Sequence, residues 1–218
     1  MIGPRRPEHR SRIAVCVTGA SGCVLALRLC EVLSGRGFRL EAVVTRAALT
    51  VADYECVSRD WFLSKLRVWV QNIYNEDELD APLASSSYIM DACIIIPASI
   101  KTLAMVVNGV AENLAVRTVL NALRMRKPVV AVVRESPVGV AELRVLYTAA
   151  KLGISIVPAV IGFYVCPQNI RDIVDFVVGK VLDVLGIEND LYRRWNEVKS
   201  RKPRLQDPCQ VLYGSEDL

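Results

Sequence analysis

The sequence predicts an α/β domain built around a parallel β-sheet with helices on both faces. Short runs rich in β-branched residues alternate with longer runs of helical period, which is the pattern of consecutive β-α-β units. Two of the short runs, CIIIPA and VVAVV, are apolar throughout, as expected for strands covered on both faces. The chain has 218 residues, of which 52% are hydrophobic, so it can bury the core of one domain.

Six strands are expected, each as an aliphatic or β-branched run bounded by glycine, proline or polar residues. In chain order they are Ile13–Thr18, Arg39–Thr45, Val68–Asn72, Ala92–Ala98, Pro128–Arg134 and Ile154–Val157. Helices are expected where apolar residues recur at helical spacing: Gly22–Leu33, Ala47–Cys56, Ser99–Met125 with a break near Gly109, Val138–Lys151 and Ile170–Leu185. The order predicts a single-domain flavodoxin-like (Rossmann-like) three-layer sandwich over residues 13–197, with a basic tail over 1–12 and a polar tail over 198–218.

The composition argues against several functional classes. The net charge of +4 is concentrated in the opening MIGPRRPEHRSR and in RRWNEVKSRKPR, so we expect solvated termini and no nucleic-acid-binding face. The only histidine is His9, which leaves the domain without a histidine for a metal site or a catalytic triad. No run approaches the length of a membrane helix. The seven cysteines form no C-x-x-C pair and indicate buried, reduced thiols in a cytoplasmic protein.

Small polar turns follow three of the expected strands. TGASG follows the first strand, Thr45 the second, and PASIKT over residues 97–102 the fourth. A helix that begins after such a turn presents free amide groups to an anion, while Ser21 or Ser99 can cap it. One such turn could be only a tight turn with a capping serine, but three at one sheet edge favour a mononucleotide. The spacing G-x-x-G lacks the dinucleotide fingerprint G-x-G-x-x-G.

Other candidate residues are ambiguous when taken singly. The stretch YNEDELDAPLASSSY has the composition of a solvated loop. Arg134 and Glu135, at the end of the fifth strand, could form a surface ion pair or a phosphate clamp with an acid beside it. Tyr164 alone is typical of a core residue, and Lys180 alone of a solvated one.

Taken together, these motifs resemble the flavin prenyltransferases of the UbiX type. The resemblance rests on VTGASG, YNEDELDAPLASSS, PASIKTLAMVVNGVAENLAVR, VVRESP and GFYVCPQNIRDIVDFVVGKVLDVLGI, which follow the order found in that family. It implies an enzyme that joins the dimethylallyl group of dimethylallyl monophosphate to N5 and C6 of reduced FMN without a metal. The product, prenylated FMN, is the cofactor of UbiD-type decarboxylases. The resemblance also implies a homo-oligomer, typically a dodecamer, with its sites at subunit interfaces.

The resemblance further implies roles for individual residues. The expected FMN-binding residues are Gly19, Ala20, Ser21, Thr45, Ser99, Ile100, Lys101, Thr102 and Arg134. The expected residues around the prenyl phosphate are Tyr164, Lys180, Arg117, Arg124, Ser85 and Trp195. Glu55, Ser21, Glu135 and Arg124 are the expected catalytic residues: Glu55 relays a proton with Ser21 near the reacting flavin, and Glu135 protonates the departing phosphate.

This chain departs from the family pattern at a few positions. Arg124 stands where lysine is frequent and Lys180 where arginine is frequent, which keeps the charge but changes the hydrogen-bonding geometry. Ser86 replaces a frequent glycine, and PAS replaces P-C-S. Two alternatives remain open: a non-catalytic FMN carrier for a partner decarboxylase, and a flavin-dependent cysteine decarboxylase. The second class relies on a histidine in the domain and a P-x-M-N type loop, neither of which this chain has.

Overall fold

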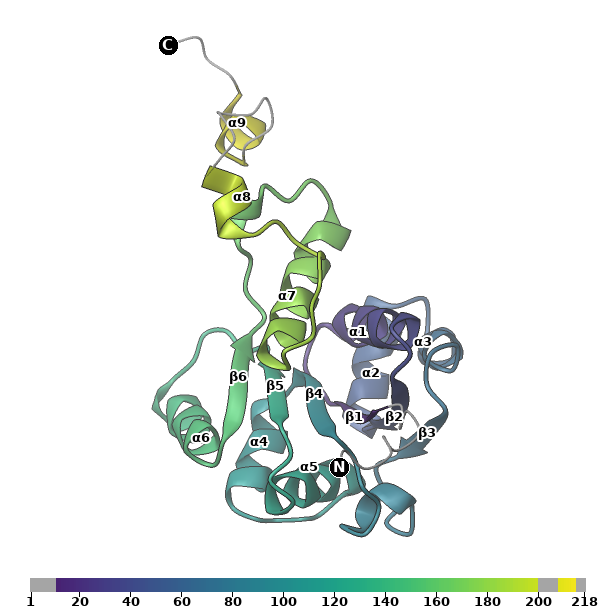
Figure 1. Ribbon diagram of the computed structural model, residues 1–218. Helices are drawn as coiled ribbons and strands as arrows, with labels where there is room; N and C mark the ends of the chain where they lie inside the picture. The colour runs from purple at the N-terminus through teal and green to yellow at the C-terminus, as the bar shows by residue number, and fades with distance from the viewer. Residues whose placement is uncertain (1–10, 200–207, 215–218) are drawn as a thin grey trace, which may run out of the picture. The chain divides into compact units, whose positions relative to one another are not determined.

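The computed structural model describes residues 11–199 and 208–214. The chain divides into two compact units, the first ending at Pro158 and the second beginning at Ala159. The first unit is built on a six-stranded sheet in the order β3-β2-β1-β4-β5-β6. All five neighbouring pairs are parallel, which confirms the predicted fold class (Figure 1).

The strands follow the apolar runs of the sequence. Their bounds are β1 Arg12–Val17, β2 Arg39–Val44, β3 Asn72–Asn75, β4 Ala92–Ala98, β5 Val129–Val133 and β6 Ile154–Pro158. Every residue of β4 and β5 is buried, as their unbroken apolar sequences require. β1 lies between β2 and β4, so the direction of the strand order changes beside β1. In such sheets, ligands bind outside the carboxyl ends of the strands at this switch point.

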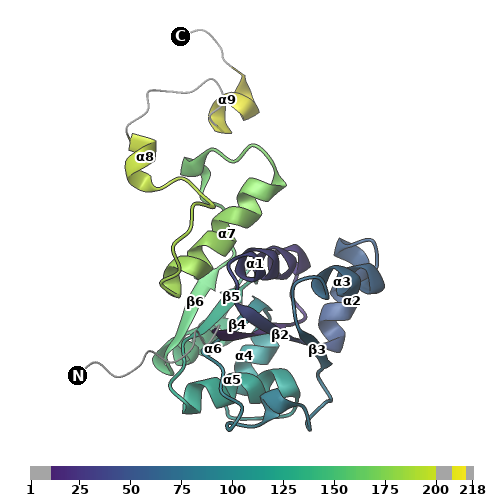
Figure 2. The same ribbon diagram turned by 45° about the vertical axis from the view of Figure 1, so that its right-hand side comes forward.

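Helices cover both faces of the sheet (Figure 2). One layer holds α1 Cys23–Gly35, α2 Arg46–Glu55 and α3 Arg59–Leu66. The other holds α4 Ile100–Val107, α5 Leu114–Arg124 and α6 Val140–Lys151. A short 3₁₀ helix, η1, spans Pro82–Ala84 between β3 and β4. The two helical layers and the sheet form the predicted three-layer sandwich.

The second unit is helical in the part that the structure describes. It contains the 3₁₀ helix η2 Phe163–Val165, then α7 Ile170–Val184, α8 Trp195–Lys199 and α9 Pro208–Tyr213. Asn169 caps α7 by accepting a hydrogen bond from the backbone N–H of Asp172 at 3.1 Å. α7 buries a continuous face that includes Phe176 and Val178.

Helices α8 and α9, the third strand and helix α3 differ from the sequence prediction, which expected no helix after Leu185. The third strand, expected over Val68–Asn72, lies over Asn72–Asn75, because the apolar run before it forms a turn in which the N–H of Val70 bonds to the carbonyl of Leu66. Helix α3 was not predicted. Ser58 caps it through a 3.1 Å bond from the N–H of Trp61, and only Phe62 and Leu66 are buried, too few apolar residues to show a helical period.

The expectation of buried thiols is right for four cysteines and wrong for Cys209, which is exposed, while Cys56 and Cys166 are partly buried. All seven cysteines are free. Within the residues that the structure describes, no helix is both long enough and apolar enough to cross a membrane.

Candidate active site

The strand-end turns singled out from the sequence lie together at one edge of the sheet, because all strands run in the same direction. β1 ends just before Thr18, β2 just before Thr45, β4 at Ala98 and β5 just before Arg134. Helices α1, α2 and α4 begin within a few residues of this edge. Their amino ends therefore present partial positive charge to the same region, which suits an anionic ligand.

Thr18 joins the first turn to the turn after β4. Its hydroxyl donates to the carbonyl of Pro97 and accepts from the N–H of Ser99, both at 2.8 Å. Ser99 in turn caps α4 by accepting from the N–H of Thr102, and the hydroxyls of Ser99 and Thr102 are 2.9 Å apart. The two turns are thus held by side-chain and backbone hydrogen bonds.

Glu55, the last residue of α2, supplies the amino-terminal cap of α1. Gly22 occupies the cap position with φ of 117°, a left-handed conformation that favours glycine, and has no side chain with which to cap. The Glu55 carboxylate accepts hydrogen bonds from the N–H of Gly22 at 2.8 Å and from the N–H of Cys23 at 2.9 Å. The acid expected to act beside the flavin is therefore anchored at the first turn.

The surroundings of Glu55 favour its ionised form. Partial burial raises the pKa of the carboxyl group, but the hydrogen bonds from Ser21, Gly22 and Cys23 lower it by more, and the charge of Arg134 adds to them. The pKa of Glu55 consequently lies below its ordinary value. Ser21, Glu55 and Arg134 thus form one electrostatic cluster at this edge.

Arg134 contributes a hydrogen-bond donor, its Nε, to the same cluster. Its Nε is buried and, within the described part of the chain, has no hydrogen-bond partner. A buried donor without an acceptor is costly, so this nitrogen is suited to a ligand oxygen.

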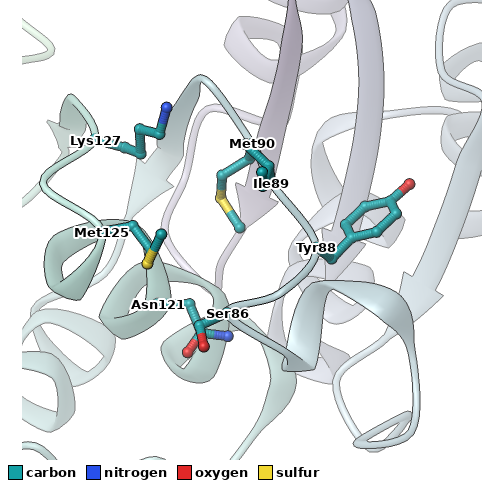
Figure 3. Close-up of a pocket in the computed structure, with 7 residues that line it drawn as sticks. All are labelled: Ser86, Tyr88, Ile89, Met90, Asn121, Met125 and Lys127. Atoms are coloured by element: carbon teal, nitrogen blue, oxygen red, sulfur yellow. The ribbon is translucent and has the colours of Figure 1, made fainter.

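Arg124 and Ser85 lie toward the other edge of the sheet. Arg124 ends α5 and donates to the side chain of Asn121 at 3.0 Å. Asn121 donates to the carbonyl of Leu83, two residues before Ser85, at 3.1 Å. A small pocket here is lined by Asn121 together with Ser86, Tyr88, Ile89, Met90, Met125 and Lys127 (Figure 3). Lys127 also pairs with Asp91, which precedes β4, at 3.9 Å. Within one chain, Arg124 and Ser85 are therefore not part of the Glu55 cluster.

Arg117 and Glu135 lie nearer the carboxyl edge of the sheet than Arg124 does. Arg117 lies in the first turn of α5, seven residues before Arg124, and so about 10 Å nearer the carboxyl edge along the helix. Glu135 follows Arg134 after β5, with an exposed side chain. Ile100, Lys101 and Thr102 form the first turn of α4, where Lys101 is exposed.

Tyr164, Lys180 and Trp195 come together in the second unit. The rings of Tyr164 and Trp195 pack edge to face with centroids 5.4 Å apart, and Tyr164 packs on Phe176 at 5.8 Å. The ammonium group of Lys180 lies 5.3 Å from the ring centroid of Phe176. Of the six residues expected around the prenyl phosphate, Tyr164, Lys180 and Trp195 therefore lie in one cluster around Phe176.

Lys180 is held in its charged form. Partial burial lowers the pKa of its ammonium group, but a hydrogen bond to Tyr192 and the neighbouring Tyr164 and Asp183 raise it by more, so the pKa lies above its ordinary value. The sequence did not predict three further residues of this cluster, Tyr192, Asp183 and Arg194. The only signal was a cluster of charged and aromatic residues in NDLYRRW, next to a stretch that was taken for a tail.

Comparison with known proteins assigns the family. Residues 2–182 match the family model described as Flavoprotein. The flavin prenyltransferase UbiX of Saccharolobus solfataricus is 40% identical over 192 residues, which cover 87% of this chain and 94% of that protein. The chain belongs to the UbiX-type flavin prenyltransferase family. The mitochondrial flavin prenyltransferase PAD1 of Saccharomyces cerevisiae is 30% identical over 195 residues, or 89% of this chain and 79% of that protein.

Solved structures of the family share this fold. AnUbiX, crystallised with FMN and dimethylallyl pyrophosphate, superposes with a TM-score of 0.81 at 31% identity, covering 86% of this chain and 98% of its own. A dodecameric, FMN-dependent UbiX-like decarboxylase from Escherichia coli gives a TM-score of 0.79 at 30% identity, with coverage of 84% and 98%. The FMN-dependent cysteine decarboxylase TvaF gives 0.58 at 19% identity, a likeness of fold alone.

The residues at the carboxyl edge fit FMN, the flavin of this family. The buried Nε of Arg134, which has no hydrogen-bond partner in the described part of the chain, can bind a flavin or phosphate oxygen. Among the described residues, no three histidine, cysteine or acidic side chains are grouped as a metal site would require.

Gly19 is the position where added bulk should disturb this edge most. A Cβ atom at Gly19 would lie 2.4 Å from the Cβ of Ala47 and 3.3 Å from its backbone carbon, so the turn or α2 would have to move. We expect Gly19→Ala to destabilise the protein by about 1–3 kcal/mol and to weaken FMN binding. Thermal melting and fluorescence titration with FMN measure the two effects. Gly35→Ala is the matched control, because nothing lies within 4 Å of its Cβ position. Unchanged FMN affinity in Gly19→Ala would show that the turn does not contact the flavin.

Proposed function

We propose that this protein transfers the dimethylallyl group of a prenyl phosphate to reduced FMN, forming prenylated FMN. The observation that carries the proposal is that the chain has two polar clusters, one in each unit. One, around Glu55 and Arg134, suits a flavin, and the other, around Tyr164 and Lys180, suits a second phosphate. A protein that only carried FMN would need the first cluster alone.

The prenyl phosphate cluster would assist departure of the phosphate. The allylic carbon–oxygen bond breaks and its electron pair leaves with the phosphate, so cationic donors stabilise the developing charge. We assign this role to Lys180 and Arg117, with the hydroxyl of Tyr164 as a further donor. Glu135 would protonate the departing oxygen. The rings of Tyr164 and Trp195 would pack against the prenyl chain.

The Glu55 cluster would act at the flavin edge. Reduced FMN supplies the electron-rich N5 and C6 that accept the prenyl carbons. Glu55 would take up the proton that N5 releases when it bonds to the prenyl group, with the Ser21 hydroxyl between the carboxylate and the ring. It would return this proton to the prenyl double bond and take up the one that C6 loses as the second bond forms. The remaining turn residues would bind FMN through backbone and hydroxyl donors: Gly19, Ala20, Thr45, Ser99, Ile100, Lys101 and Thr102.

We further propose that the active site is completed in a homo-oligomer, of which a dodecamer is the expected form. The positions of Arg124 and Ser85 support this. Because they lie away from Glu55 within one chain, a site that uses all three must draw on a second copy. The product would pass to a UbiD-type decarboxylase as its cofactor. Seven free cysteines agree with a cytoplasmic location.

Anaerobic incubation of the protein with reduced FMN and dimethylallyl monophosphate, in the presence of EDTA, tests the function. We expect mass spectrometry to find a flavin heavier than FMN by the prenyl group, and EDTA to leave the yield unchanged. A parallel reaction with dimethylallyl diphosphate defines the donor. Bound flavin of unchanged mass with both donors would contradict the proposal and favour an FMN carrier.

A further inference from the structure

Glu41 is a charged residue at a buried position of β2. The strand is otherwise apolar from Leu40 to Val44, and Glu41 is only 2% exposed. Burying a carboxylate costs free energy unless charged or hydrogen-bonding groups surround it. An apolar side chain at this position would avoid that cost, and neither the FMN cluster nor the prenyl phosphate cluster uses Glu41.

Among the described residues, three side chains bind the Glu41 carboxylate. The Tyr74 hydroxyl donates to Oε2 at 3.2 Å, the Tyr88 hydroxyl donates to Oε1, and Nε of Arg12 lies 3.3 Å from Oε1. Arg12 and Tyr74 belong to β1 and β3, the strands on either side of β2, whereas Tyr88 belongs to the loop before β4. Glu41 therefore joins this loop to the sheet.

Arg12 holds the same loop from a second side. Its guanidinium carbon lies 4.2 Å from the centroid of the Tyr88 ring, and its Nη1 donates to the carbonyl of Ile89 at 2.9 Å. The backbone N–H of Arg12 donates to the carboxylate of Asp91 at 2.8 Å. The Tyr88 ring points away from Met125, which lines the same pocket (Figure 3). Tyr88 is thus fixed both at its hydroxyl and on one face of its ring.

Tyr88 closes a turn that carries Ser85. The N–H of Tyr88 donates to the carbonyl of Ser85 at 3.2 Å, and the N–H of Ser87 donates to Oγ of Ser85, also at 3.2 Å. The hydroxyl oxygens of Ser85 and Ser87 are 2.8 Å apart. The three serines of the turn, residues 85–87, are exposed, so Tyr88 supplies the anchor within the turn. The position of the Ser85 hydroxyl consequently depends on where Tyr88 is held.

We propose that Tyr88 is a positioning residue that, bound by Glu41, holds the Ser85 hydroxyl in place to contact the prenyl donor. The inference rests on the proposed function, in which Ser85 contributes to the prenyl phosphate site. Glu41 and Arg12 act one step further back, because they fix the tyrosine. This role accounts for a carboxylate in an apolar strand, since an aliphatic residue there would leave the Tyr88 hydroxyl without its acceptor.

Tyr88→Phe in the full-length, FMN-loaded protein tests the proposal, because it removes the hydroxyl bound to Glu41 and keeps the ring beside Arg12. We expect KM for dimethylallyl monophosphate to rise by roughly tenfold, the lower end of what a hydrogen bond to a charged group contributes. The kcat and the FMN affinity should not change. An unchanged KM would overturn the proposal.

Tyr74→Phe is the matched control. It removes a hydroxyl from the same carboxylate, but Tyr74 lies in β3 and not in the serine turn. We expect both variants to melt at a lower temperature than wild type, while Tyr74→Phe keeps the wild-type KM. An equal rise of KM in the two variants would assign the effect to lost stability and would overturn the positioning role.

A double-mutant cycle shows whether Tyr88 acts through Ser85. Added to Ser85→Ala, the Tyr88→Phe change should raise KM by less than about twofold, because the group that it positions is already absent. An effect of the same size in both backgrounds would overturn the proposal. So would a Ser85→Ala protein with the KM of wild type.

Hydrogen exchange without prenyl phosphate measures the turn itself. The amides of residues 87 and 88 should exchange faster in Tyr88→Phe than in wild type and at the wild-type rate in Tyr74→Phe. Equal exchange in all three proteins would overturn the anchoring. If exchange changed as expected but wild-type protein formed no prenylated flavin, the proposed function would fail and the anchoring of the turn by Tyr88 would stand.

Discussion

Glu55→Gln is expected to slow prenyl transfer by roughly a hundred- to ten-thousand-fold, the contribution of a positioned proton acceptor. The carboxylate lies at the first turn and is kept ionised by its hydrogen bonds and by Arg134, so at neutral pH it is ready to accept a proton. Glutamine is nearly the same size, and its oxygen can still accept from the N–H groups of Gly22 and Cys23. Folding and FMN affinity should therefore change little. Single-turnover formation of prenylated flavin, followed by mass, measures the loss.

The pH dependence follows from the direction of the pKa shift. Because the pKa of Glu55 is depressed in the folded protein, its carboxylate and the cap on α1 are present above the ordinary glutamate range and are lost as pH falls through the lowered pKa. The Glu55→Gln variant should lack this acid limb in its rate profile.

Glu142→Gln is the matched control for Glu55→Gln. Glu142 also caps a helix, accepting from the N–H of Gly139 at 2.7 Å, and its pKa is likewise lowered by backbone hydrogen bonds. It should retain full transfer activity. Comparable losses in the two variants would assign the effect to helix capping and would remove Glu55 from the chemistry.

Lys180→Met should lower kcat/KM for the prenyl phosphate by about a hundredfold, because the lost hydrogen bonds join charged partners. Methionine retains most of the length and the apolar contacts of the lysine stem, so the packing against Phe176 and Tyr192 should persist. FMN binding, which we assign to the carboxyl edge of the sheet, should be unchanged. Steady-state kinetics with varied prenyl phosphate, together with FMN titration, separate the two effects.

Lys151→Met provides the control for Lys180→Met, since Lys151 also lies over a tyrosine ring and has an exposed side chain. It should behave as wild type. If Lys180→Met kept its kcat/KM, the second cluster would have no part in phosphate binding. A loss shared with Lys151→Met would point to net charge as the cause.

Most of the sheet could be predicted because its strands are buried on both faces. The apolar sequences of β4 and β5 leave few other structures open to them. β3 is different, because it is a four-residue edge strand with two half-buried and two exposed residues. So short a strand shows no recognisable period, and the prediction placed it on the apolar residues before it, which form a turn. Helix α3 was not predicted for a similar reason, since only two of its residues, Phe62 and Leu66, are buried.

The site could be predicted as a set of turns but not as a set of contacts. Parallel strands bring their carboxyl ends to one edge, which placed Thr45 and Ser99 correctly beside the first turn. The bond from Gly22 to Glu55 joins residues 33 positions apart, and no local pattern specifies it. The family resemblance pointed to Lys180 but not to Tyr192, because the loop that returns Tyr192 to α7 has no regular period.

The Thr18 hydroxyl donates one hydrogen bond and accepts another, and this pair of bonds affects ligand affinity. Since one hydroxyl joins the turns after β1 and β4, much of their conformational entropy is lost when the chain folds. A ligand that binds there need not order them again, so less of its interaction energy is spent on immobilising the protein. The first turn is thus preorganised for the flavin that we propose binds there.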